Sequence, residues 1–194
     1  MKRAIALLEK HNLLKIISDE LDINLEIPHI AYVEVKRPDS KAILFTNVVD
    51  RKNSKKFKEP VLMNVFCNED AVKLFIGDGD KIGSEIESLL KLKPPVTFSE
   101  KLSTLGKLFS LKNTIPKKIK GKGICQEVIK LGADAKLSDL PVIKTWEEDG
   151  GPFITMGQVY TQSLNGELKN LGMYRLQVFP DNTLGMHWQI HKDS

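Results

Sequence analysis

The sequence predicts a mixed α/β (α+β) protein in which an N-terminal α/β domain is followed by a unit of antiparallel strands. Two apolar stretches rich in β-branched residues, 42–49 and 61–66, are typical of buried strands, and segments of helical periodicity lie on either side of them. Strand-like segments and tight turns fill the C-terminal end instead. The lysine-rich stretch 116–123 has no periodicity and indicates a linker. We therefore expect domains at residues 1–120 and 121–194.

In the first part of the N-terminal domain, apolar residues at helical spacing alternate with short apolar runs. The first helix follows from a stripe that includes Ile5 and Leu8, and Pro28 fits the first turns of the second helix, where a missing N–H costs least. His29 is interpreted as a surface or core histidine, since no ligand partner is near in sequence. The expected elements are a helix over 2–11, a strand over 14–17, a helix capped by Asp22, a strand over 42–49, a loop over 51–58 and a strand over 61–66.

Three more helices are expected before the linker, each introduced by a polar residue that accepts hydrogen bonds from the free N–H groups of the first turn. Asn68 precedes the first of them, and Gly77 follows its end. Asp80 opens the second and Ser99 caps the third. After the linker, the apolar run Cys125–Leu131 predicts a strand.

Three strands joined by tight turns are expected in the C-terminal unit. Asn165-Gly166 supplies the positive φ angles that a tight hairpin needs, and the Pro-Asp-Asn-Thr run at 180–183 favours a second turn. Together they predict a three-stranded antiparallel meander. Its strands are expected at 153–163, 171–179 and 184–190.

Polar side chains gather on the last two of these strands. The middle strand opens with Asn170 and carries Arg175 among apolar neighbours. Since successive residues of a strand point to opposite faces, the third strand separates into two sets. A solvated outer face is one interpretation of its polar set, and a binding site is the other. The sets are Leu184, Met186, Trp188 and Ile190 on one face, and Gly185, His187, Gln189 and His191 on the other.

Composition and charge argue against several classes of protein. Hydrophobic residues make up 41% of the sequence, but the longest apolar runs are strand-sized, so we expect no membrane span and no secretory signal. Cys67 and Cys125 lie far apart without metal-type spacing, which predicts reduced thiols in a cytoplasmic protein. The net charge is +4, yet no aromatic residues are interleaved with the lysine clusters, so we expect no nucleic-acid binding.

Three blocks of sequence stand out, at Asp149–Thr155, Asn170–Arg175 and Met186–Lys192. In order and in spacing they resemble the UbiD family of decarboxylases, which use a prenylated flavin mononucleotide (prenylated FMN). A weaker resemblance covers Leu140-Pro141 with Trp146, and the segments 42–48 and 60–64. Nearly the whole chain is included, but it looks like less than half of a family member.

The resemblance implies both a fold and an activity. The C-terminal unit would be the first strands of a flavin-binding split β-barrel, completed by residues beyond this chain. The activity would be the non-oxidative decarboxylation of an aromatic or unsaturated carboxylic acid, with the prenylated flavin as electron sink. Branches of the family serve menaquinone and ubiquinone biosynthesis, and residues 156–160 look most like the menaquinone branch.

The resemblance also assigns residues to a site. Arg175 is expected to act in catalysis as well as in cofactor binding, because its guanidinium is planar and always charged. Asn170 and His191 would bind a divalent cation, usually manganese, that bridges to the flavin phosphate, with potassium as a further cation. A glutamate from beyond the chain would complete the metal site. The cofactor-binding residues would be Met173, Tyr174, Arg175, His187, Trp188, Gln189 and Lys192.

The family's catalytic carboxylates come after Ser194, so no proton donor is assigned. Glu147, Glu148 and Asp149 are interpreted as loop residues, and we expect the 194-residue chain alone to be inactive. The alternative function is a flavin-binding or purely structural barrel module that does no chemistry. The expected partners are a small aromatic acid, a flavin prenyltransferase that supplies the cofactor, further copies of the chain when it is full length, and a membrane surface reached through a prenylated substrate.

Overall fold

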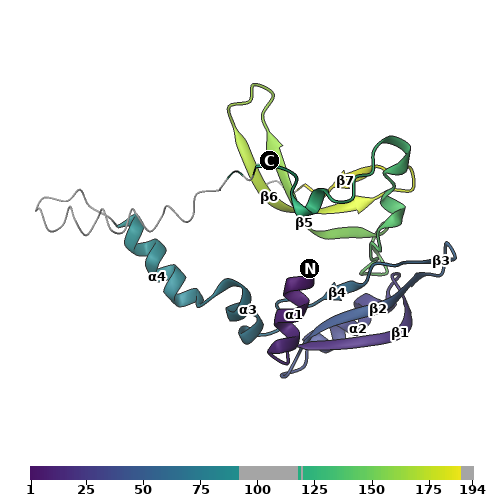
Figure 1. Ribbon diagram of the computed structural model, residues 1–194, viewed down its shortest axis with the longest axis horizontal. Helices are drawn as coiled ribbons and strands as arrows, with labels where there is room; N and C mark the ends of the chain where they lie inside the picture. The colour runs from purple at the N-terminus through teal and green to yellow at the C-terminus, as the bar shows by residue number, and fades with distance from the viewer. Residues whose placement is uncertain (92–117, 119, 189–194) are drawn as a thin grey trace, which may run out of the picture. The chain divides into compact units, whose positions relative to one another are not determined.

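The computed structural model describes residues 1–91, 118 and 120–188 (Figure 1). Its contacts divide the chain into two units, one made of Met1–Phe75 with Ala135–Ser194 and the other of Ile76–Asp134. The helix expected to follow Ser99 lies outside the described residues. The domain boundary near residue 120 stays a prediction.

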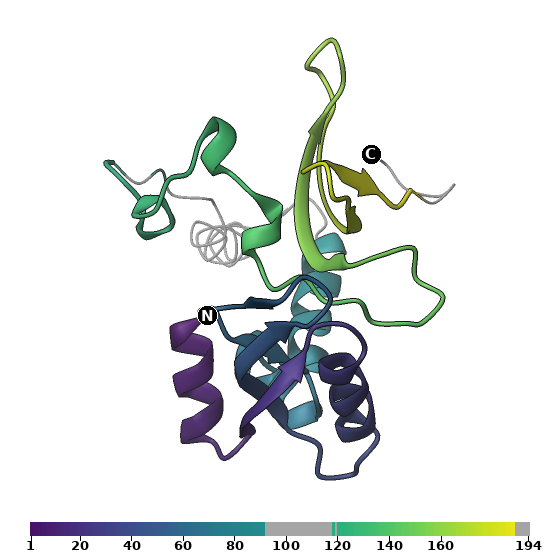
Figure 2. The same ribbon diagram turned by 90° about the vertical axis from the view of Figure 1, so that its right-hand side faces the viewer.

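The first unit contains a four-stranded sheet built around one buried strand, which confirms the predicted α/β class. The central strand β2 pairs in parallel with β1 and antiparallel with both β3 and β4. In Figure 2, the purple helix α1 and the indigo helix α2 flank this sheet on opposite sides. The elements are α1 (Lys2–Lys10), β1 (Leu14–Asp22), α2 (Glu26–Val35), β2 (Ala42–Asp50), β3 (Lys55–Lys56) and β4 (Val61–Met63).

The hydrophobic core of this sheet contains one residue from far along the chain. Ile143 is 7% exposed and packs with the buried side chains of the sheet and of α2. Its neighbour Lys144 forms a parallel bridge with Asn24, with backbone hydrogen bonds of 3.0 and 3.1 Å to Ile23 and Leu25. The chain after Ala135 is therefore part of the N-terminal core. The other core residues are Ile23, Ile27, Ile43, Phe45, Val48 and Phe57.

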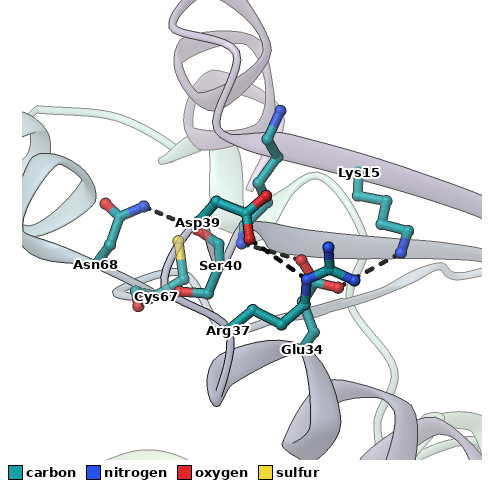
Figure 3. A network of polar contacts seen from close by, with 8 residues as sticks. Lys15, Glu34, Arg37, Asp39, Ser40, Cys67 and Asn68 are labelled. Atoms are coloured by element: carbon teal, nitrogen blue, oxygen red, sulfur yellow. Dashed lines mark hydrogen bonds and ion pairs between the residues drawn. The ribbon is translucent and has the colours of Figure 1, made fainter.

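Buried and partly buried polar contacts join the end of α2 and the following Ser40 to β1 and to the residues just before the next helix (Figure 3). The Ser40 hydroxyl donates to the Cys67 carbonyl oxygen at 2.7 Å, and the Asn68 amide donates to the Ser40 carbonyl oxygen at 2.8 Å. The buried carboxylate of Glu34 accepts from Lys15 at 3.4 Å. Because each of these polar groups has a partner, their burial costs little free energy.

Two more helices follow, at α3 (Glu69–Ile76) and α4 (Gly79–Leu90). The predicted cap of α3 is confirmed, since Asn68 Oδ1 accepts from the Ala71 N–H at 2.9 Å. The helix predicted at Asp80 is confirmed too, but its cap is Asp78, whose carboxylate accepts from the N–H groups of Asp80 and Lys81. Gly77 has a φ of 98° between the two helices, a conformation in which a side chain would be strained.

Several predicted elements were wrong in place or in kind. Asp22 does not cap α2: it ends β1, a longer strand than predicted, and α2 follows Leu25, which has no side-chain cap. The stretch 51–58 is not all loop, because it contains β3. The strand predicted at 61–66 ends at Met63 and is half-buried.

The apolar run Cys125–Leu131 is not a strand. It begins in a short 3-10 helix, Ile124–Gln126, and its large apolar side chains are exposed. A strand is stable only when its N–H and C=O groups pair with a neighbour. None of the described strands pairs with this run.

The predicted three-stranded antiparallel meander is confirmed, although its third strand, expected over 184–190, ends at Met186. It consists of β5 (Phe153–Gln162), β6 (Lys169–Val178) and β7 (Leu184–Met186), with β6 in the middle. Gly166 takes a φ of 77° in the first turn, as the Asn-Gly sequence predicts. None of the helices among residues 1–91 and 120–188 combines the length and the apolar character that a membrane crossing needs.

Candidate functional site

The predicted site residues of β6 and the chain after β7 lie on two faces of the meander. The pairs of β6 and β7 run from Val178 with Leu184 to Leu176 with Met186, and His187 N–H donates to the Arg175 carbonyl oxygen at 3.0 Å. Paired residues of adjacent strands share a face, and successive residues alternate. One face therefore carries Met173, Arg175 and His187, and the other carries Asn170, Tyr174 and Trp188.

Tyr174 dominates the second face. Its side chain is buried, its hydroxyl lies 3.5 Å from the Asn170 amide nitrogen, and its ring centroid is 5.7 Å from that of Trp188. The ring lies directly over Gly172, where a Cβ would approach it to 2.5 Å. A glycine is thus required at residue 172 for the Tyr174 ring to lie along the strand.

Arg175 on the first face is held by an acidic residue that precedes β5. Its Nη1 and Nη2 donate to Asp149 Oδ1 and Oδ2 at 3.0 and 2.6 Å. Its Cζ lies 3.7 Å from the centroid of the Phe153 ring, a cation–π distance. Asp149 Oδ2 also accepts from the Trp146 N–H at 3.1 Å, so the carboxylate is anchored independently of the arginine.

The ion pair is partly buried, so solvent and salt screen it less than they screen a fully exposed pair. The Asp149 side chain is 11% exposed and that of Arg175 is 32% exposed. The two hydrogen bonds from Arg175 hold the pKa of Asp149 below its ordinary value, and the Trp146 N–H adds to this, while burial opposes it. A bidentate, charge-assisted pair of this kind also fixes the orientation of the guanidinium.

The depressed pKa of Asp149 predicts an acid-dependent stability. The pair stabilises the fold above the unfolded-state pKa of about 3.9, and this contribution is lost as the pH falls through the lower folded-state value. Asp149→Asn should therefore lower the urea midpoint at neutral pH, with a difference that shrinks below about pH 4. The exposed neighbour provides a control, since Glu148→Gln should change the midpoint little. A deficit of Asp149→Asn that is constant at every pH would contradict the assignment.

Exposed apolar side chains share the face of β6 that carries Arg175. Met173 is 62% exposed, and Leu171 and Tyr160 next to it are also exposed. The register pairs Tyr160 with Leu171, so the three side chains share one face of β5 and β6. A cation beside exposed apolar surface is suited to a planar, partly apolar anion.

The described residues supply one of the two predicted metal ligands. Asn170 lies on the face opposite Arg175, and His191, like Gln189 and Lys192, is outside the described residues. Within 1–91 and 120–188, three or more His, Cys, Asp or Glu side chains do not gather anywhere in a metal-binding arrangement. These described residues alone do not make a manganese site.

A separate cavity of about 410 Å³ lies beside α2. Pro28, Tyr32, Met63 and Trp146 line it, and the Tyr32 and Trp146 rings meet edge to face with centroids 5.6 Å apart. No described residue of β6 lines this cavity. It is therefore not the space that the predicted site residues share.

Two residues of the site were not assigned from the sequence, namely Asp149 and Phe153. Asp149 was interpreted as a loop residue, which is its backbone state, but its partner Arg175 lies 26 residues away. An acidic side chain next to an Asp-Gly-Gly turn and an arginine in an apolar strand were the available signals. Neither signal specifies that the two side chains meet.

Comparison with known proteins places both parts of the chain. Residues 5–90 match the 3-octaprenyl-4-hydroxybenzoate carboxy-lyase N-terminal domain, and residues 117–194 match the Rift-related domain of the same carboxy-lyase. An uncharacterised protein of Helicobacter pylori is 46% identical over 100% of this chain and 32% of its own length. An uncharacterised protein of Aquifex aeolicus is 40% identical over 96% of this chain and 37% of its own length. The chain thus spans about a third of the length of these relatives.

Solved structures share the fold at low identity. The closed form of vanillic acid decarboxylase from Sedimentibacter hydroxybenzoicus has a TM-score of 0.67 at 20% identity, over 95% of this chain and 36% of that one. A second solved structure is that of the UbiD-class enzyme HmfF from Pelotomaculum thermopropionicum in complex with prFMN. Its TM-score is 0.61 at 20% identity, over 97% of this chain and 38% of that one. Two consecutive domain matches to one enzyme and this common fold lead to one conclusion: the chain belongs to the UbiD family of carboxy-lyases.

Proposed function

We propose that this chain is the N-terminal third of a UbiD-type decarboxylase that removes the carboxyl group of an aromatic or unsaturated acid with prenylated FMN. The supporting observation is the guanidinium of Arg175, held in a fixed orientation beside exposed apolar side chains. An aromatic acid and the isoalloxazine ring of a flavin are both planar, and each molecule carries an anionic group, a carboxylate or a phosphate, so this face suits either. Menaquinone or ubiquinone biosynthesis is the proposed context, with the menaquinone branch preferred.

The proposed work of this chain is binding and orientation. Met173 and His187 share the face of Arg175 and would contact the cofactor there, with Gln189 and Lys192 as further contacts. Tyr174 and Trp188, packed together on the opposite face, would support the strand from behind. Arg175 would hold an anionic group in place while the carboxylate leaves. The bound prenylated flavin supplies the electron sink that this departure requires.

The proposed metal site rests on ligand chemistry. The Asn170 carbonyl oxygen is a hard ligand that suits Mn²⁺, and the imidazole of His191 is also acceptable to that ion. Potassium would be an accompanying cation. The third protein ligand and the proton donor would both come from residues beyond Ser194.

The partners follow from the same proposal. A flavin prenyltransferase would supply the cofactor, and the full-length enzyme would act as a homo-oligomer in the cytoplasm, meeting the membrane through a prenylated substrate. HmfF is described as having an evolved dimeric form, which makes self-association a reasonable expectation. A flavin-binding or structural module without chemistry is the alternative.

The test is carbon dioxide release by the full-length enzyme. After co-expression with a flavin prenyltransferase, it should decarboxylate at least one member of a panel of benzoic acids with and without prenyl chains. The 194-residue chain, given the same cofactor, should release none. Flavin binding by the full-length enzyme without turnover on any acid would support the module instead, and turnover by the short chain would place the proton donor within it.

A further inference from the structure

The hydrogen-bonding capacity of Arg175 is used on one end only. A guanidinium has five N–H donors in a planar fork. Asp149 occupies one hydrogen of Nη1 and one of Nη2. The edge formed by Nε and the second Nη2 hydrogen makes no hydrogen bond to another residue within 1–91 and 120–188 in this structure. That edge has the geometry that a carboxylate or phosphate accepts in bidentate fashion.

The flat faces of the guanidinium are not equivalent either. The Phe153 ring covers one of them at 3.7 Å, which fills the space on that side. The backbone beneath is fixed as well, because the Arg175 carbonyl oxygen accepts from the His187 N–H at 3.0 Å. Phe153 thus covers one flat face of the guanidinium, and the Nε–Nη2 edge is left for a ligand.

Asp149 is itself fixed by the fold rather than by the arginine. The turn Trp146–Asp149 is closed by the Asp149 N–H to the Trp146 carbonyl oxygen, and its carboxylate receives the Trp146 N–H in return, both at 3.1 Å. Just before this turn, Lys144 bridges to Asn24 and Ile143 is buried in the core. The carboxylate is thus a fixed point of the first unit, against which the long arginine side chain is held.

We propose that Asp149 is the positioning residue of Arg175, and that it presents the free guanidinium edge to an oxyanion bound on the Met173 face. This inference rests on the proposed function for the identity of that oxyanion, which is either the substrate carboxylate or the cofactor phosphate. Without Asp149, Arg175 keeps its charge but loses its orientation. Oxyanion binding in the correct geometry is then lost while the fold remains.

The decisive variant is Asp149→Asn, which removes the charge and keeps an oxygen for the Trp146 N–H. In the full-length enzyme, kcat should fall by about 10- to 100-fold, the size of effect that a misplaced catalytic group produces. A rise in KM for the acid identifies the substrate carboxylate as the ligand, and a weaker flavin affinity identifies the cofactor phosphate. Glu148→Gln removes a charge from the exposed neighbour and should leave kcat, KM and flavin affinity unchanged.

A second readout does not depend on turnover. In ¹⁵N-arginine NMR spectra of the 194-residue chain, slowed rotation of the Arg175 guanidinium should be visible in the wild type and in Glu148→Gln, and lost in Asp149→Asn. Added benzoate or inorganic phosphate should shift the Arg175 Nε–H signal in the wild type more than in Asp149→Asn.

The two readouts separate the two hypotheses. If the wild-type enzyme releases no carbon dioxide but the NMR results are as expected, the proposed function fails and the positioning role stands. Unchanged guanidinium rotation in Asp149→Asn overturns the positioning role. The positioning role is also overturned if Asp149→Asn keeps the kcat, KM and flavin affinity of the wild type while Arg175→Gln changes them.

Discussion

Replacing Arg175 with glutamine is expected to lower the proposed decarboxylation by the full-length protein by at least about 100-fold, as loss of a fixed donor at a reacting anion does in other enzymes. Glutamine keeps a polar side chain of similar reach but has no charge and no fork. The measurement is carbon dioxide release in single-turnover experiments on enzyme with equal cofactor content. Arg37→Gln, at an exposed arginine paired with Asp39, is the matched control.

The Arg175→Gln variant should also lose stability, because its partner Asp149 remains largely buried without a counter-charge. The double variant Arg175→Gln/Asp149→Asn replaces both charges and should recover much of the thermal midpoint without recovering activity. Recovery of both together would show that Arg175 acts on stability alone. Full activity of the single variant would remove Arg175 from the catalytic site.

Replacing Ile143 with alanine is expected to destabilise the first unit by about 2–5 kcal/mol, the usual cost of a large-to-small change in a core. Ile143 is one of the seven buried residues that form the N-terminal core cluster. The free energy of unfolding is measured by urea denaturation with tryptophan fluorescence. Ile124→Ala, at a side chain that is 86% exposed, is the matched control and should change it by less than about 0.5 kcal/mol.

Equal effects of the two isoleucine changes would mean that the segment after Ala135 does not complete the N-terminal core. A loss confined to Ile143→Ala would confirm the contact. The size of the loss also depends on how far Phe45 and Phe57 relax into the space that is left.

Local features of the fold were predictable because their causes lie within a few residues. The Asn68 cap, the Asn-Gly turn before β6 and the order of β5, β6 and β7 follow from short-range preferences for capping, positive φ and alternation. The prediction that Asp22 caps a helix was wrong because β1 extends through Asp22. That extension depends on pairing with β2. The strand predicted over 125–131 was wrong because an apolar composition does not by itself provide a neighbouring strand with which to pair.

The sequence could propose residues for the candidate site, but it could not predict how they are arranged. The three sequence blocks identified Asn170, Tyr174 and Arg175, yet residues adjacent in sequence point to opposite faces, and the register with neighbouring strands decides which residues share a face. The partner of Arg175 depends on a contact across 26 residues. A contact between two residues that far apart produces no periodic pattern in a single sequence, so it cannot be predicted from one.

The position of Ile143 in the N-terminal core has a consequence for synthesis. The ribosome releases the chain from its N-terminus, so β1, β2 and α2 emerge long before the residue that closes their core. Until then, the apolar side chains of β2 lack the covering that Ile143 supplies, and transiently exposed apolar surface of this kind favours aggregation. Formation of this sheet is thus tied to the arrival of the segment that carries Asp149.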